Sequence, residues 1–199
     1  MGETLAERGK LTRRGLVGTA ALGAGATLIG LSPSVLRAAS APSAAGDKAI
    51  YGFALRLEAL QARFYQQALL RGGLRGELRE FAEVVSDHEN QHLRAVEKQA
   101  GRKGAMRYDF RGATAHQASF AHAARVLEDL GVFAYNGQLA NLTATGMELA
   151  VRIVSVEGRH AAWIRDLVGM APAPRPIDPG QEAARVAAEL TALGFRRTR

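Results

Sequence analysis

The stretch DHENQHL, at positions 87–93, decides the fold. Within it Glu89 and His92 are three residues apart, and residues at this spacing lie on one face of a helix. A carboxylate and an imidazole presented on one face can bind the same metal ion. The same Glu-x-x-His spacing recurs at Glu157 and His160. Two copies in one short chain predict a helical protein organised around a metal site.

The composition is that of a globular protein without thiol chemistry. The chain has 199 residues, enough for one domain with a sizeable core, and 47% of them are apolar. There are no cysteines, which excludes disulfides, zinc–thiolate sites and thiol nucleophiles. Any metal must therefore be bound by Glu, Asp or His, which favours iron, manganese or zinc. The net charge is +7, but the basic residues are scattered and aromatic residues are few, so we expect no nucleic-acid partner.

The first 46 residues have the layout of an export signal. A basic region containing Arg13 and Arg14 precedes a weakly apolar stretch at 16–31 and a run of small residues at 38–46. The TRRGL run around the two arginines resembles a twin-arginine signal, although the usual Phe and Lys are missing. We expect cleavage within 38–46 and a periplasmic or extracellular protein. The alternative is an uncleaved membrane anchor, for which the apolar stretch is short.

The rest of the sequence predicts an all-α protein. Apolar residues recur at helical spacing, and no alternating run is long enough to indicate a sheet. The expected helices span residues 48–71, 74–100, 115–137, 142–168 and, as a short amphipathic segment, 181–193. The four long helices, with a long connection between the second and the third, predict an up-down four-helix bundle over residues 47–170. Residues 171–199 are expected to hold a Pro-rich segment, the short helix packed on the bundle, and a frayed tail at 196–199.

The bundle sequence is an internal duplication. Glu58 precedes Tyr65 by seven residues, and Glu128 precedes Tyr135 by seven. Each half therefore supplies one Glu and, on the following helix, one Glu-x-x-His pair. All four Glu share a helix face with apolar residues, the face that a helix turns toward the core. An unpaired buried carboxylate costs several kcal/mol, so two divalent cations are needed to balance the four charges, with two neutral imidazoles completing the site.

This pattern resembles the ferritin-like superfamily of di-iron and di-manganese carboxylate proteins. Within it, the chain is similar to the exported bacterial ferritin-like group that includes plant desiccation-related proteins, above all in EDLGV at 128–132 and VEGRHA at 156–161. The resemblance covers residues 48–168 and implies two divalent metal ions, iron or manganese, with Glu89 and Glu157 bridging them. The metal ligands that it implies are Glu58, Glu89, His92, Glu128, Glu157 and His160.

Some residues near the predicted site have alternative roles. His88 and His92 with Glu89 spell the His-Glu-x-x-His motif of zinc proteases, in which both histidines bind zinc and the Glu is the general base. That interpretation leaves the second Glu-x-x-His pair unexplained, because Val156 stands where a second histidine would be needed. In the bundle interpretation His88 is a neighbour at the edge of the site. Asp129 is the rival of the adjacent Glu as a ligand.

Tyr65 and Tyr135 are either hydrogen-bond donors to the ligand carboxylates or ordinary core aromatics. Two functions fit the predicted centre. One is an oxidoreductase, ferroxidase-like or peroxide-consuming, with dioxygen or peroxide as the reactant. The other is a metal-binding or stress-protective module without turnover. The oligomeric state is open, and nothing in the sequence indicates a storage shell.

Overall fold

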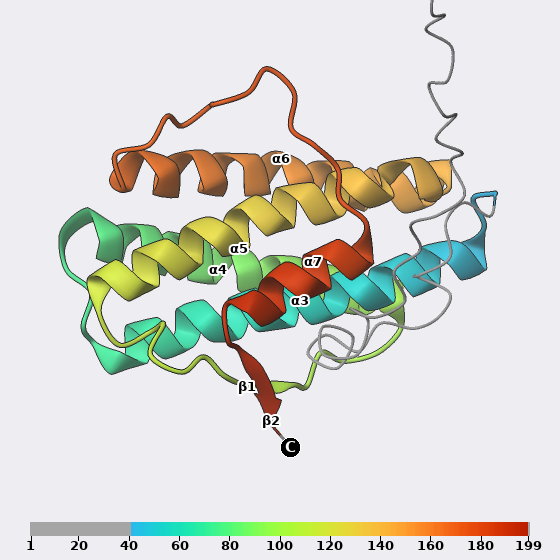
Figure 1. Cartoon of the computed structure of the whole chain (residues 1–199). Coiled ribbons are helices and arrows are strands. Elements are labelled where there is room, and N and C mark those ends of the chain that lie inside the picture. The colour runs from blue at the N-terminus through green and yellow to red at the C-terminus, as the bar shows by residue number, and fades with distance from the viewer. Residues whose placement is uncertain (1–40, 199) are drawn as a thin grey trace, which may run out of the picture.

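The computed structural model describes residues 41–198, so the expected export signal lies almost entirely outside the described residues. Four long helices form the body of the molecule (Figure 1). They are α3 (Ala44–Arg71), α4 (Gly76–Ala100), α5 (Gln117–Gln138) and α6 (Ala144–Leu167). The remaining elements are the 3-10 turn η1 (Leu139–Asn141), the helix α7 (Ala183–Ala192) and the strands β1 (Arg107–Asp109) and β2 (Arg196–Thr198). The predicted all-α bundle is confirmed. None of the described helices is long and apolar enough to cross a membrane.

The bundle is built from two helical hairpins, α3–α4 and α5–α6, which pack against each other through α3 with α5 and α4 with α6. The connection at 101–116 runs back along the length of the bundle (Figure 1). As a result α4 and α5 point the same way, and each helix runs antiparallel to its packed neighbours. This is the long connection between the second and third helices that the sequence predicts.

Local signals explain where the helices begin and end. The Ser43 side chain accepts a hydrogen bond from the backbone N–H of Gly46, and this cap starts α3 four residues before the expected position, inside the segment assigned to the export signal. Thr143 caps α6 in the same way. Gly72 and Gly101 end α3 and α4 in the left-handed region, with φ of 67° and 65°.

One prediction about the C-terminal part is wrong. The sequence predicts a frayed tail at 196–199, yet its residues 196–198 form β2, which pairs antiparallel with β1, with Arg197 opposite Tyr108. Phe195, which precedes β2, is 3% exposed, and its ring centroid lies 5.0 Å from that of Phe110 and 6.0 Å from that of Phe64. The burial of this aromatic ring holds the tail in place. The strands have three residues each, too few for an alternating pattern to be recognised.

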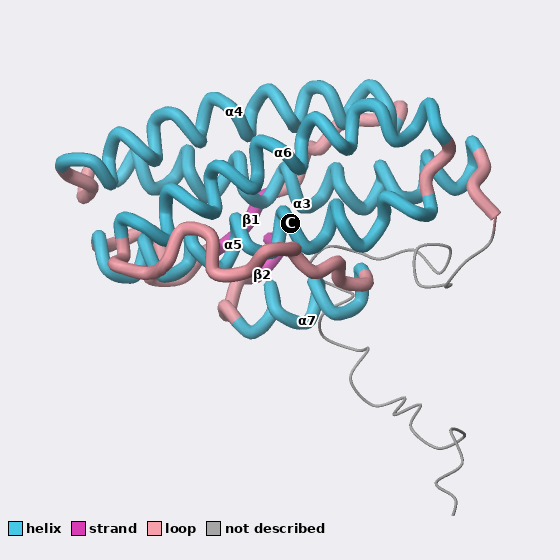
Figure 2. Tube along the Cα trace, turned by 90° about the horizontal axis from the view of Figure 1, so that it is seen from above, coloured by secondary structure: helices cyan, strands magenta, loops and turns pink. Residues whose placement is uncertain are grey.

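The helix α7 packs against α5, as the amphipathic pattern predicts, and Figure 2 shows it on the outside of the bundle with the loop that leads to it. Its inward residues Val186 and Leu190 are fully buried. The apolar residues form two clusters, one containing Tyr65 and the other Tyr135. The hydroxyls of these two tyrosines donate to the buried carboxylates of Glu128 and Glu58, so a set of buried acidic side chains lies between the two clusters.

The loop at 168–182 crosses α5 at Gly137, where no side chain fits. A Cβ atom at Gly137 would lie 2.0 Å from the carbonyl oxygen of Gln181, and the backbone N–H of Gln181 donates to the carbonyl of Phe133 at 2.8 Å. We expect Gly137→Ala to displace this crossing and to lower the free energy of unfolding by about 1–3 kcal/mol, measured by urea unfolding.

The matched control is Gly158→Ala on α6, where a new methyl group would meet no heavy atom within 4 Å. Alanine favours a helix over glycine by up to about 1 kcal/mol, so this variant should be as stable as the original chain or more so. Equal stability of the two variants would show that the loop does not approach α5 this closely.

Candidate metal centre

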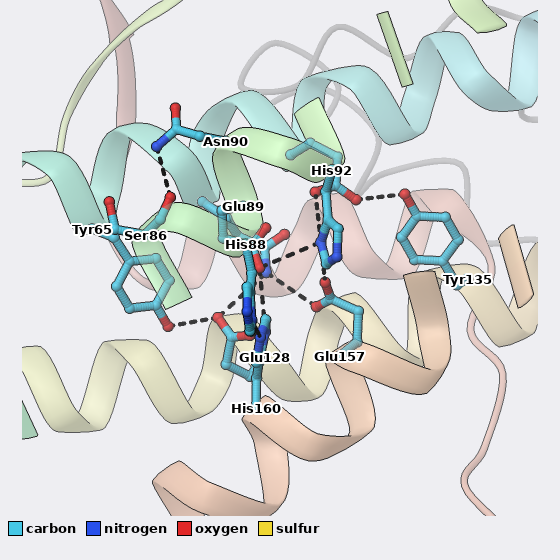
Figure 3. Close-up of polar contacts among 12 residues, drawn as sticks. Tyr65, Ser86, His88, Glu89, Asn90, His92, Glu128, Tyr135, Glu157 and His160 are labelled. Atoms are coloured by element: carbon cyan, nitrogen blue, oxygen red, sulfur yellow. Dashed lines mark hydrogen bonds and ion pairs between the residues drawn. The ribbon is translucent and has the colours of Figure 1, made fainter. Parts of the chain in front are cut away.

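Six side chains from all four long helices converge at the middle of the bundle (Figure 3). The four carboxylates are fully buried, and the two histidines are 8% and 3% exposed. They are Glu58 from α3, Glu89 and His92 from α4, Glu128 from α5, and Glu157 and His160 from α6. The structure thus brings together all six residues that the sequence predicts as ligands.

These side chains form two overlapping groups, and in each group one oxygen or nitrogen atom per residue lies within 4.8 Å of the others. Glu89 and Glu157 belong to both groups. Glu58 and His92 complete the first group, and Glu128 and His160 complete the second. Two adjacent groups that share two carboxylates are compatible with the binding of two metal ions side by side.

Each imidazole faces the centre with its Nδ1 atom. Nδ1 of His92 lies 3.1 Å from Glu157 Oε1 and 3.6 Å from the nearest oxygens of Glu58 and Glu89. Nδ1 of His160 lies 3.1 Å from Glu128 Oε2 and 3.3 Å from Glu89 Oε1.

Two tyrosines hold the outer carboxylates, and each reaches across from the other half of the duplication. The Tyr65 hydroxyl on α3 donates to Glu128 Oε1 at 2.6 Å, and the Tyr135 hydroxyl on α5 donates to Glu58 Oε1 at 2.5 Å. Burial, and then the facing carboxylate, raise the pKa of both phenols well above the usual value, so both remain protonated donors. Each carboxylate is thereby oriented with its second oxygen toward the histidines.

The polar atoms at the centre are short of partners. Among the buried atoms that make no hydrogen bond are Glu58 Oε2, both oxygens of Glu89, Glu157 Oε1 and His92 Nδ1. An unsatisfied buried polar group costs about 1–3 kcal/mol. Carboxylate oxygens and imidazole nitrogens are the donors that iron and manganese take in proteins. The residues present therefore fit a pair of divalent cations.

Protons balance the charges when no cation is bound. Burial, and then the charge of Glu89, raise the pKa of Glu157 to about 7. Burial opposes the charged form of the histidines, but their contacts with the carboxylates raise the pKa of His92 to about 11 and that of His160 to about 10. Burial acts to raise the pKa of Glu89 as well, yet contacts with the two histidines lower it to about 2.

Metal binding at this centre must displace those protons, since a ligand binds in its deprotonated form. In the metal-free protein His92 and His160 are protonated below their raised pKa values of about 11 and 10. The affinity for metal should therefore rise as the pH rises toward these two pKa values. Between about pH 6 and about pH 8 we expect a gain of roughly tenfold per pH unit for each displaced proton. Calorimetric titration with Mn²⁺ in buffers of different ionisation enthalpy measures the affinity for the metal and the number of protons released on binding. A pH-independent affinity without proton release would contradict these pKa shifts.

Asp129 and His88 have other partners. The Asp129 carboxylate forms ion pairs with Arg165 at 2.5 Å and with Arg125 at 3.1 Å, and it belongs to neither group. His88 Nδ1 lies 2.9 Å from His160 Nε2, with the two rings nearly parallel at 15°. His88 therefore contacts the histidine of the opposite hairpin, and neither metal-capable group of the described residues pairs it with His92 as a zinc protease would require.

Two residues at the centre have no role in the sequence-based prediction. Gln61 Nε2 lies 3.4 Å from Glu128 Oε1 and 3.5 Å from Glu157 Oε2. Gly131 leaves room for Glu157, because a Cβ atom there would lie 2.1 Å from Glu157 Oε2. The two positions are equivalent in the duplication, each three residues after a predicted ligand. A comparison of the two halves position by position would have drawn attention to them.

Comparison with known families agrees with this geometry. A family model described as a ferritin-like domain matches residues 46–170, which contain all but the first two residues of the four long helices and all six residues of the centre. No curated protein sequence matches the chain.

Proposed function

The chain belongs to the ferritin-like family, and on that premise we propose that its four long helices bind a dinuclear centre of iron or manganese. The observation that carries the proposal is that Glu89 and Glu157 belong to both metal-capable groups. In this proposal Glu58 and His92 complete the coordination of one cation. Glu128 and His160 complete the coordination of the other cation. Four carboxylates and two divalent cations leave no net charge in the core, and this removes the cost of burying the acids.

The reaction that we propose is oxidation of Fe(II) by dioxygen or consumption of peroxide. A pair of iron or manganese ions supplies the electrons for such chemistry when it is bound. The chain supplies the rest. Tyr65 and Tyr135 orient the outer carboxylates through their hydroxyl hydrogen bonds, and the two apolar clusters on either side exclude bulk water.

The test is aerobic addition of Fe(II), or addition of peroxide, to the purified chain. Turnover should fall to background in Glu58→Ala and in Glu157→Ala, because each variant removes a carboxylate from a metal-capable group. Glu148→Ala is the matched control, since Glu148 lies on α6 with Glu157 but is exposed. Turnover that persists unchanged in both ligand variants would reject the enzymatic proposal.

The burial of the centre favours a second candidate, a metal site that stabilises the bundle without turnover. All four carboxylates are fully buried, so no ligand side chain other than the two histidines reaches the surface at all. In that case the cations raise the melting temperature and a chelator lowers it, while neither Fe(II) nor peroxide is consumed. A protective role like that of the desiccation-related group belongs with this candidate.

We further propose that the protein is exported. The support is the order of basic, apolar and small residues within 1–46, including Arg13 and Arg14. Cell fractionation of the full chain tests this. Replacement of both arginines by lysine should retain the protein in the cytoplasm, and retention of the N-terminal segment at the membrane would indicate an anchor in place of a cleaved signal.

A further inference from the structure

The two halves of the centre come from equivalent positions of the duplication, yet they differ at two of these positions. Three residues after the first glutamate, α3 has Gln61 and α5 has Gly131. Immediately before the second glutamate, α4 has His88 and α6 has Val156. A glutamine and a histidine can hydrogen-bond to a ligand, whereas a glycine and a valine side chain cannot.

The first difference concerns the outer nitrogen of each histidine. A neutral imidazole that offers Nδ1 to a metal carries its proton on Nε2 and donates from there. His160 has an acceptor for this proton, because its Nε2 lies 2.9 Å from His88 Nδ1. In the part of the chain that the structure describes, every polar contact of His92 is made through Nδ1, toward the centre. Within residues 41–198, a side chain outside the centre thus fixes the tautomer and ring orientation of His160 but not those of His92.

The second difference concerns the carboxylates. Gln61 Nε2 lies 3.4 Å from Glu128, which belongs only to the group that contains His160, and 3.5 Å from Glu157, which belongs to both groups. Gly131, the equivalent residue, offers no amide to Glu58. Each outer carboxylate has one tyrosine, so the tyrosines do not distinguish the two sides. The contact of Gln61 with Glu128 and that of His88 with His160 therefore fall on the same side of the centre.

We infer that the two metal positions are inequivalent, and that the position formed with Glu128 and His160 binds its cation first and more tightly. The inference rests on the proposed dinuclear centre and adds an order of filling to it. His88 is a positioning residue in this scheme. It acts through His160, and the loss of such a partner weakens metal affinity by about 10–100-fold. The position formed with Glu58 and His92 fills second and exchanges its cation faster.

The experiment is a calorimetric titration of the metal-free full chain with Mn²⁺, at one pH, together with electron paramagnetic resonance at one equivalent of metal. The original chain should show two separate binding steps, and a signal of isolated Mn²⁺ at one equivalent. His88→Val reproduces the residue of the other half, and should weaken the tighter step by about 10–100-fold so that the two steps converge.

Two variants serve as controls for the loss of a histidine. His88→Asn keeps an acceptor close to the position of Nδ1, so it should retain the separation of the two steps. His122→Val removes an exposed histidine from α5 and should change neither step. Circular dichroism establishes that each variant is folded before the titration is interpreted.

The possible failures are distinguishable. If the original chain binds no Mn²⁺ and no Fe²⁺, the proposed function itself is wrong. If two cations bind in indistinguishable steps, or if folded His88→Val keeps both steps unchanged, the centre is dinuclear but the inferred inequivalence is wrong. If His88→Val abolishes binding as completely as His92→Ala, then His88 is a ligand and its assignment as a positioning residue is overturned.

Discussion

Replacement of Glu89 by glutamine should abolish the binding of both cations, whereas replacement of Glu58 should abolish only one. Glu89 belongs to both metal-capable groups and Glu58 to one. Glutamine keeps the size of the side chain but removes the charge and one oxygen donor, so the core stays filled while both positions lose the negative charge of a shared carboxylate. After loading with Mn²⁺ or Fe²⁺ and dialysis, elemental analysis should find close to two metal ions in the original chain, one in Glu58→Gln and none in Glu89→Gln.

The control for Glu89→Gln is Glu83→Gln. Glu83 lies on the same helix but is exposed and pairs with Arg79 at 2.8 Å. Its replacement should leave the metal content unchanged, since exposed ion pairs contribute little and Glu83 belongs to neither metal-capable group. A Glu89→Gln variant that keeps one tightly bound ion would show that Glu89 binds only one of the two cations and does not bridge them.

Gly131→Ala should weaken metal binding at both positions without unfolding the protein. The new methyl group would lie 2.1 Å from Glu157 Oε2 and 3.0 Å from its Cδ atom, so the carboxylate must move away from the centre. Glu157 belongs to both groups, and its displacement removes a donor from each. We expect the affinity for Mn²⁺, measured by calorimetry, to fall at least about tenfold, as for the loss of a supporting contact in other metal sites.

The metal-free stability of the same variant separates a local effect from general damage. Alanine raises helix propensity by up to about 1 kcal/mol over glycine, and the atoms that must give way belong to the end of one side chain. The free energy of unfolding of metal-free Gly131→Ala should therefore change by less than that of Gly137→Ala, where backbone atoms of Gln181 block the methyl group. Unchanged metal affinity in Gly131→Ala would show that Glu157 binds in another conformation.

Much of the fold follows from the sequence because helix periodicity and charge are local properties. The apolar stripes define four helices whose ends lie within a few residues of the predicted ones, and glycines such as Gly72 and Gly101 mark their termini. The spacing of Glu89 and His92 places both on one helix face without any knowledge of the partner helices. The duplication favours Glu128 over Asp129 as the ligand, and the structure turns Asp129 toward Arg165.

The order and polarity of the residues along the chain thus determined the bundle and the six side chains at its centre. The tertiary structure alone decided the contacts made between helices. These include the tyrosines that reach across the halves, the pairing of His88 with His160, and the β1–β2 contact between segments that neither residue spacing nor local propensity links. The reason is physical: a helix repeat specifies which face a side chain occupies, but which atoms it meets depends on how two separate helices are rotated and packed against each other.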